Sequence, residues 1–182
     1  MKIATLWTLL EAAHAACGHT DYVVVGSLSI LGMEQVAAVP IGMTMSIDAD
    51  CYTLADPPRI FDLKPLLGEG SAFHVQHGIF LDPVSPKLPT LPARWEGRLI
   101  LVKHQNLAAH FLEPNDAAIS KLARGEPRDL RWVRAGITAG LITLSTLALR
   151  MKSTTFLDAA EELGTIDRIA KLRLAPAIHL NR

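Results

Sequence analysis

An alternating segment with two aspartates sets the strongest limit on how this chain can fold. Across residues 43–54, apolar side chains alternate with polar ones, a period of two that predicts a strand with one face in the core. Asp48 and Asp50 then project from the same face, while Ala49 points into the core. Adjacent carboxylates repel each other without a cation, and such hard oxygen ligands suit Mg²⁺. The alternative is a solvated strand face on which each aspartate pairs with a basic residue.

A second informative segment lies upstream of the two aspartates. The apolar run of residues 22–25 predicts a strand buried on both faces, and it ends at Gly26 and Ser27. Because a helix is expected over residues 28–39, backbone N–H groups and the Ser27 hydroxyl can face a phosphate there. The alternative for Gly-Ser alone is a tight turn with a helix cap. The order strand, helix, acidic strand favours the metal interpretation of Asp48 and Asp50.

The remaining patterns predict an α/β fold. Before residue 114 they predict a first helix ending at Gly18, a short helix over residues 61–67, and strands over residues 73–81, 98–103 and 107–112, the last two as a hairpin. After residue 114 they predict one helix from Asn115 or Asp116 to Gly125 and another from Pro127, whose buried stripe is Leu130, Val133 and Ile137. They predict a third helix over residues 156–163, capped by Thr155 and Asp158, and a last one over residues 166–172. We therefore expect a small mixed sheet flanked by helices in residues 1–113, with the acidic strand near its centre. The helical residues 114–182 would pack on this core as a single compact unit.

Composition limits the classes of partner. The 182 residues suit one ordinary domain, and 18 Lys and Arg against 18 Asp and Glu leave no global basic field, so any nucleic-acid contact needs a local patch. Cys17 and Cys51 cannot supply a disulfide framework, which makes a reducing cytoplasm the expected location. The apolar residues 135–149 are too few to span a membrane, and Glu11 argues against a signal peptide, so we expect no membrane association.

Two further groups of residues could do chemistry. Lys121 could bind phosphate or accept a proton near Asp129, and Arg128 could add charge there; the alternative is a helical surface with ordinary ion pairs. Candidate zinc ligands are His74, His77 and His104. Residues three apart on a strand face opposite sides, so the predicted strand over residues 73–81 argues against a zinc site at the first two histidines.

These segments together resemble a known superfamily. Val24-Val25-Gly26-Ser27, followed by Met45-Ser46-Ile47-Asp48-Ala49-Asp50, resembles the Gly-Ser plus Asp-x-Asp signature of the DNA polymerase beta type nucleotidyltransferases. Residues 111–116, 120–125 and 128–130 look like the Lys…Arg-Asp motif of minimal nucleotidyltransferases and AbiEii-like toxins. Residues 78–84, 91–92 and 95–99 are similar to the middle of the same group. The likeness covers residues 20–150.

The resemblance implies a reaction and a set of roles. Gly26 and Ser27 would hold the triphosphate of an NTP such as ATP, and Lys121 with Asp129 would complete the site. Asp48 and Asp50 would bind Mg²⁺ or Mn²⁺, with Asp82 as the candidate third carboxylate. A hydroxyl of a nucleic acid such as tRNA, or of a protein, would attack the α-phosphorus, and pyrophosphate would leave. The likeness to toxins implies a cognate antitoxin protein as a partner.

The chain also departs from the pattern of this superfamily. Val25 precedes Gly26 where members often have a Gly-Gly doublet, and residues 41–43 (Ile-Gly-Met) stand where members have an arginine before the acidic pair. These departures support a second interpretation from a different class. In that interpretation the chain is a catalytically silent module that binds a nucleotide or a partner protein.

Overall fold

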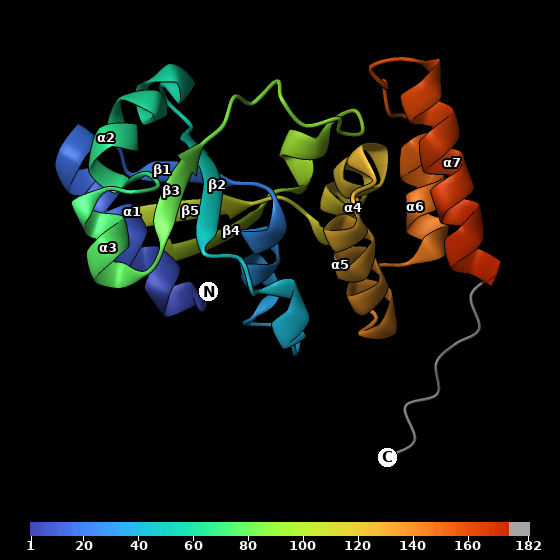
Figure 1. The fold of residues 1–182 in the computed structure, drawn as a ribbon, viewed down its shortest axis with the longest axis horizontal. Helices are drawn as coiled ribbons and strands as arrows, with labels where there is room; N and C mark the ends of the chain where they lie inside the picture. The colour runs from blue at the N-terminus through green and yellow to red at the C-terminus, as the bar shows by residue number, and fades with distance from the viewer. Residues whose placement is uncertain (175–182) are drawn as a thin grey trace. The chain divides into compact units, whose positions relative to one another are not determined.

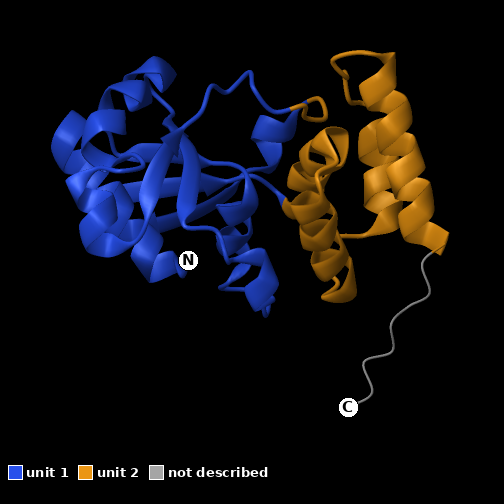
Figure 2. Cartoon of the chain, viewed as in Figure 1, with its two compact units in different colours: residues 1–89, 94–113 blue, residues 90–93, 114–182 orange. Residues whose placement is uncertain are grey.

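The computed structural model describes residues 1–174, and the chain divides into two compact units (Figures 1 and 2). Unit 1 consists of Met1–Pro89 and Arg94–Glu113. Unit 2 consists of Thr90–Ala93 and Pro114–Arg182. The last eight residues of the predicted helical part, 175–182, lie outside the described residues.

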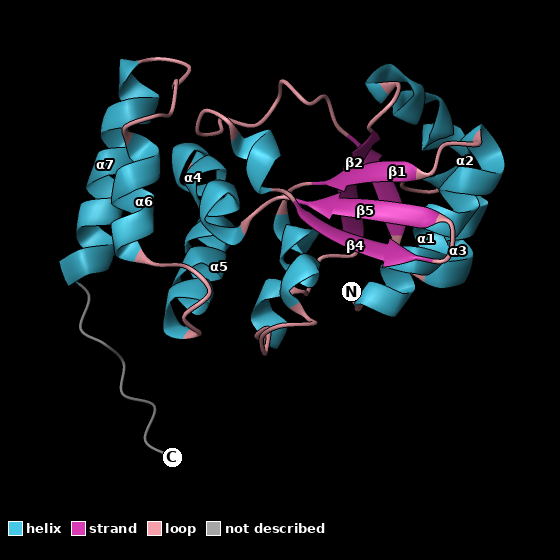
Figure 3. Ribbon diagram, turned by 180° about the vertical axis from the view of Figure 1, so that it is seen from behind, coloured by secondary structure: helices cyan, strands magenta, loops and turns pink. Residues whose placement is uncertain are grey.

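Unit 1 contains the mixed sheet that the sequence predicts (Figure 3). Its strands are β1 (Asp21–Val24), β2 (Asp48–Thr53), β3 (Phe80–Pro83), β4 (Ile100–His104) and β5 (Leu107–Phe111), in the order β3-β2-β1-β5-β4. The central strand β1 pairs antiparallel with β2 and parallel with β5. β3 is parallel to β2, and β4 forms the predicted hairpin with β5. The acidic strand β2 therefore lies next to the central strand.

The helices of unit 1 bury apolar side chains beside this sheet. The first helix, α1 (Ile3–Cys17), buries Leu6, Leu9, Leu10 and Ala13 and ends at Gly18, as predicted. The other elements are η1 (Ser27–Met33), η2 (Ile41–Met43), η3 (Pro57–Leu63), α2 (Lys64–Leu67), α3 (Ala72–His77) and η4 (Trp95–Arg98), where η denotes a 3-10 helix. The short helix expected over residues 61–67 is thus η3 followed by α2. Both ribbon views show α1, α2 and α3 together on one side of unit 1 (Figures 1 and 3).

Two expectations before the acidic strand are wrong in extent. The predicted helix over residues 28–39 is the 3-10 helix η1 followed by turns, and Val36 is exposed. Five consecutive residues of η1, 28–32, are buried, so their largely apolar character reflects burial on all sides and not one helical stripe. The strand predicted from residue 43 begins only at Asp48, and Met45 and Ile47 are exposed. The paired residues of β2 begin at Asp48, and Ile47 adds one hydrogen bond, in which its carbonyl oxygen accepts from the Phe80 N–H (3.0 Å).

The strand predicted over residues 73–81 is also wrong. This segment forms the helix α3 and only then the strand β3. The Ser71 hydroxyl caps α3 by accepting a hydrogen bond from the His74 N–H (3.1 Å), and Gly78, with a φ of 68°, ends the helix. Phe73 stacks on His77 four residues later, at 4.3 Å between ring centroids. These local contacts outweigh the strand propensity of the apolar residues.

Unit 2 is helical in its described part. Its helices are α4 (Pro114–Arg124), α5 (Pro127–Thr138), α6 (Leu144–Met151) and α7 (Ala159–Leu174). α5 starts at Pro127 as predicted, and α4 starts at Pro114, one residue before the earlier of its two predicted starts. The predicted stripe of α5 is wrong in part, because only Val133 of the three named residues is fully buried. The helix instead buries Asp129, Trp132, Val133 and Gly136.

The end of unit 2 differs more from the prediction. One continuous helix, α7, replaces the two helices expected over residues 156–163 and 166–172. At its start the Asp158 carboxylate, rather than Thr155, accepts a hydrogen bond from the Glu161 N–H (2.8 Å). Gly164 does not end the helix, and Arg168 one turn later donates to the Leu122 carbonyl oxygen (2.6 Å) at the end of α4. In residues 1–174, no helix has both the length and the apolar character needed to cross a membrane.

Candidate metal and nucleotide site

Three aspartates of unit 1 come together at neighbouring strands. Asp48 and Asp50 lie on β2, and Asp82 lies on β3 directly opposite Asp50 in the parallel pair. One carboxylate oxygen of each lies within 4.8 Å of those of the other two, and all three residues are half-buried. In residues 1–174 this is the one group of three or more acidic, histidine or cysteine side chains placed to hold a metal ion. Carboxylate oxygens are the ligands that Mg²⁺ and Mn²⁺ prefer.

The electrostatics of this acidic triad, Asp48, Asp50 and Asp82, show the cost of the arrangement. Partial burial raises the pKa of Asp82 above its ordinary value, and the neighbouring negative charge of Asp48 raises it further. The nearby charge of Lys64 acts in the opposite direction and lowers that pKa. The repulsion favours any cation that can lie between the three carboxylates.

Gly26 lies directly against this triad. Its φ of 63° is in the region that favours glycine, and a Cβ atom built on it would lie 1.8 Å from Oδ2 of Asp50. The Val25 N–H donates to the Asp50 carbonyl oxygen (2.9 Å), which fixes the turn beside β2. The structure thus brings Gly26, which follows β1, into contact with Asp50 of β2.

Ser27 and Ser29 continue the chain from this turn. Ser27 is half-buried at the start of η1. The Ser29 hydroxyl donates to the Gly26 carbonyl oxygen (2.9 Å) and so holds the turn from its other side. The Gly-Ser turn is therefore fixed by contacts to both β2 and η1.

Ser46 is a further residue of the site, beyond those that the sequence predicts. Its hydroxyl donates a hydrogen bond to Oδ1 of Asp48. One oxygen of Asp48 is thereby held by the protein, which orients the carboxylate. The alternating pattern places Ser46 among the polar positions of the segment, but such a pattern does not reveal a hydrogen bond.

Lys121 and Asp129 form a second cluster, which belongs to unit 2. Both are buried, with 4% and 1% of their side chains exposed, and Nζ of Lys121 lies 3.4 Å from Oδ1 of Asp129. Arg124 donates to both carboxylate oxygens of Asp129, each at 2.7 Å. The Lys121 ammonium also lies 4.9 Å from the centre of the Trp132 ring.

The pKa of Asp129 records this environment. Burial alone would raise it, but the hydrogen bonds from Arg124 and the charge of Lys121 outweigh burial and hold it below its ordinary value. Asp129 is therefore ionised at neutral pH. The sequence does not reveal Arg124 as the partner of Asp129, because the two residues lie on different helices and no helical spacing relates them.

The other residues considered from sequence belong to neither cluster. The Arg128 side chain is 66% exposed and pairs with Glu126 at 2.8 Å. His74 and His77 lie on the helix α3, so the strand argument used against zinc there is wrong. Nδ1 of His74 accepts a hydrogen bond from the Gly70 N–H (3.0 Å), and His104 lies 3.4 Å from Glu11.

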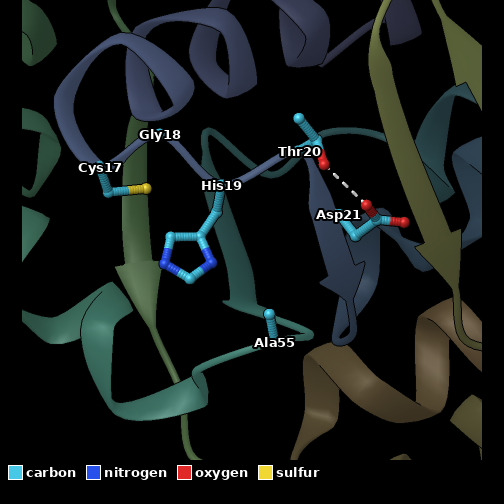
Figure 4. A pocket seen from close by; sticks show the side chains of 6 residues that line it. All are labelled: Cys17, Gly18, His19, Thr20, Asp21 and Ala55. Carbon is cyan, nitrogen blue, oxygen red and sulfur yellow. Dashed lines mark hydrogen bonds between the residues drawn. The ribbon is translucent and has the colours of Figure 1, made fainter.

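A pocket of about 330 Å³ lies at the other end of β1 (Figure 4). It is lined by Cys17, Gly18, His19, Thr20, Asp21 and Ala55. The Thr20 hydroxyl donates to Asp21 (2.8 Å), and this bond is the largest of the causes that lower the pKa of Asp21. The pocket is separate from the acidic triad, because Gly26 follows the carboxyl end of β1 whereas residues 17–21 lead into its amino end.

The comparison with known families agrees with a site of this kind. Residues 4–170 match the family described as a nucleotidyltransferase of unknown function (DUF6036). The match covers most of the chain, so the protein belongs to this nucleotidyltransferase family. No curated protein and no solved structure matches the chain at a significant level.

Proposed function

We propose that the protein is a metal-dependent nucleotidyltransferase that moves a nucleoside monophosphate from an NTP to a hydroxyl group of a nucleic acid or a protein. The acidic triad beside Gly26 is the observation that carries this proposal. A glycine turn next to three carboxylates lets a phosphate approach the backbone close to the metal ligands. Bound Mg²⁺ or Mn²⁺ would supply charge stabilisation for the phosphates and for the attacking oxygen.

The residues of unit 1 then have distinct roles. Asp48, Asp50 and Asp82 hold the metal, with Ser46 orienting Asp48. Gly26 and Ser27 bind the triphosphate. In the reaction, the hydroxyl oxygen of the acceptor forms a bond to the α-phosphorus, and its proton passes to water. The bond from that phosphorus to the bridging oxygen breaks, and pyrophosphate leaves.

Lys121, Asp129 and Arg128 of unit 2 also have roles in this proposal. Lys121 and Arg128 bind the nucleotide, and Asp129 positions Lys121 through their ion pair. These roles follow from the resemblance to the DNA polymerase beta type superfamily. The ion pair supports them because it fixes the position of the lysine ammonium.

Calorimetric titration tests the proposal. ATP, GTP, CTP and UTP are titrated with Mg²⁺ into the wild type and into the double variant Asp48→Asn/Asp50→Asn. We expect binding of at least one nucleotide by the wild type and none by the double variant. A circular dichroism spectrum shows whether the variant is folded. Equal binding by both proteins would refute the proposed site.

A second candidate function is a silent module that binds a nucleotide without transferring it. It is favoured by residues 41–43, which offer no arginine ahead of the acidic pair. In the structure these residues form η2, with Met43 buried and Ile41 exposed. Nucleotide binding without release of pyrophosphate, in Mg²⁺ and in Mn²⁺, would support this candidate over the enzyme.

The proposal also includes a biological setting, a toxin with a cognate antitoxin protein in the cytoplasm. The setting rests on the resemblance to AbiEii-like toxins, and the free thiols of Cys17 and Cys51 support the reducing compartment. We expect expression of the wild type to arrest bacterial growth and expression of Asp48→Asn/Asp50→Asn to leave it unchanged. Growth arrest by both proteins at equal expression levels would show that toxicity does not depend on Asp48 and Asp50.

A further inference from the structure

The neutral chain is divided into units of opposite charge. Unit 1 holds 7 Lys and Arg against 11 Asp and Glu, whereas unit 2 holds 11 against 7. The formal charges are therefore −4 and +4, although the whole chain has none. A local excess of positive charge attracts polyanions even when the net charge of the protein is zero.

Part of this positive charge forms a row on α5. Arg128, Arg131 and Arg134 are spaced by three residues and are all exposed, and we call them the α5 arginine row. Helical geometry places them within about 120° of one another around the helix axis. The residues that α5 buries, including Trp132 and Val133, lie on the opposite side.

Acidic neighbours leave most of the positive charge of this row without compensation. Among the described residues, Arg131 and Arg134 have no ion-pair or hydrogen-bond partner. Arg128 pairs with Glu126 at the start of the helix. The one acidic residue of α5 itself, Asp129, is buried and paired with Lys121 and Arg124. The exposed face of α5 is therefore positive along the row.

The chemistry of this face fits a phosphate backbone better than a protein surface. No large apolar side chain of α5 is exposed, whereas protein interfaces have an apolar centre. Trp132 is buried, so α5 offers no aromatic ring on which a base could stack. Successive arginines of the row rise by about 4.5 Å along the axis, comparable to the spacing of charges along a nucleic-acid strand.

We propose that the α5 arginine row, through Arg131 and Arg134, binds the sugar-phosphate backbone of a nucleic acid, without preference for its sequence. This inference rests on the proposed function and deepens it, because it names a nucleic acid, rather than a protein, as the partner that the chain binds. Guanidinium groups bind phosphate oxygens with two parallel hydrogen bonds, so Arg131 and Arg134 can each hold one phosphate.

Fluorescence anisotropy tests the inference with short labelled RNA and DNA of mixed sequence, single-stranded and duplex. The full chain is measured without NTP or metal, as wild type and as Arg131→Gln/Arg134→Gln. We expect the double variant to bind about tenfold more weakly at low salt. The slope of its log affinity against log salt concentration should be smaller by the equivalent of about one to two phosphate contacts. The RNA and DNA arms show which nucleic acid is preferred.

A matched control removes the same charge from another helix of unit 2. Lys171→Gln/Arg173→Gln changes two exposed cations of α7, and we expect a loss of affinity below about threefold. Equal losses in the two variants, an unchanged affinity in Arg131→Gln/Arg134→Gln, or no binding by the wild type would overturn the inference. Tighter binding of poly-glutamate than of RNA would overturn it in favour of an acidic protein.

The same proteins separate this inference from the proposed function. Asp48→Asn/Asp50→Asn should keep its affinity for nucleic acid while losing NTP binding. Arg131→Gln/Arg134→Gln should keep NTP binding while losing affinity for nucleic acid. Failure of NTP binding alone would refute the proposed site in unit 1, and failure of nucleic-acid binding alone would refute the α5 arginine row.

Discussion

In unit 1, Asp48, Asp50 and Asp82 bring three like charges within 4.8 Å of one another, whereas in unit 2 the buried Asp129 lies between two cations. A second buried acid of unit 2, Asp116, also pairs with a cation, Arg150, at 2.9 Å. Like charges held close together cost stability unless a cation binds, and paired buried charges lose stability when one partner is removed. The acidic cluster of unit 1 is therefore suited to binding, and the ion pairs of unit 2 are suited to holding helices together.

The largest effect is expected in unit 2 from Asp129→Asn. The change leaves Lys121 and Arg124 without their carboxylate, and we expect the free energy of unfolding to fall by about 3–5 kcal/mol. Urea denaturation measures the change. Asp167→Asn is a matched control, because this exposed residue pairs with Lys171 at the surface, and its cost should stay below about 1 kcal/mol.

The stabilisation that the ion pairs of Asp129 give to the folded protein depends on pH. The pKa of Asp129 is lowered in the folded state, so its contribution to stability is present above the unfolded value of about 4. It is lost as the pH falls through the lowered pKa. The difference in the free energy of unfolding between the wild type and Asp129→Asn should be largest at neutral pH and should fall toward zero in acid. A difference that persists unchanged below that range would contradict the ion-pair explanation.

Metal binding should stabilise unit 1, whereas the charge deletion Asp129→Asn should destabilise unit 2. Mg²⁺ or Mn²⁺ at a hundred times its dissociation constant should stabilise the protein by about 2.7 kcal/mol. Asp82→Asn should raise the melting temperature without metal, because it relieves the repulsion, and should remove the stabilisation by metal. Since the raised pKa of Asp82 lets protons compete with the cation, the metal-induced shift should shrink as the pH falls. Thermal denaturation with and without metal measures both effects.

A somewhat smaller effect is expected from Gly26→Ala. The backbone at Gly26 is strained for any other residue, and the added Cβ would displace the Asp50 carboxylate, so we expect a cost of about 2 kcal/mol together with weaker metal binding. Gly42→Ala is the matched control. No atom lies within 4 Å of a Cβ there and the φ is not in the left-handed region, so its stability should change by less than about 0.5 kcal/mol. Equal effects of the two changes would show that Gly26 has no special contact.

The smallest effect is expected from Ser46→Ala. Without the hydroxyl, Asp48 loses one hydrogen bond that orients it, and we expect metal affinity to fall by about tenfold. Calorimetry with Mn²⁺ measures the affinity. Ser46→Thr keeps the hydroxyl and should restore most of it, whereas a purely structural role would give no such rescue.

Much of the fold follows from local patterns in the sequence. The first helix, the hairpin of β4 and β5 and the start of α5 agree with periodicity and with the positions of proline and glycine. The segments that differ have a tertiary cause. Residues 28–32 are buried on all sides of η1, and Arg168 of α7 donates to the Leu122 carbonyl oxygen at the end of α4 (2.6 Å). Local spacing does not report either contact.

The candidate site divides in the same way. The amino-acid order is enough to place Asp48 and Asp50 on one strand face, because side-chain direction along a strand depends only on its period of two. Strand pairing and helix packing, in contrast, set Asp82 opposite Asp50, Gly26 against the Asp50 carboxylate and Arg124 onto Asp129. These contacts join segments far apart in the chain or on different helices, so no local pattern encodes them. The same packing turns α5 so that its arginines face outward, which makes a charged surface from a sequence whose net charge is zero.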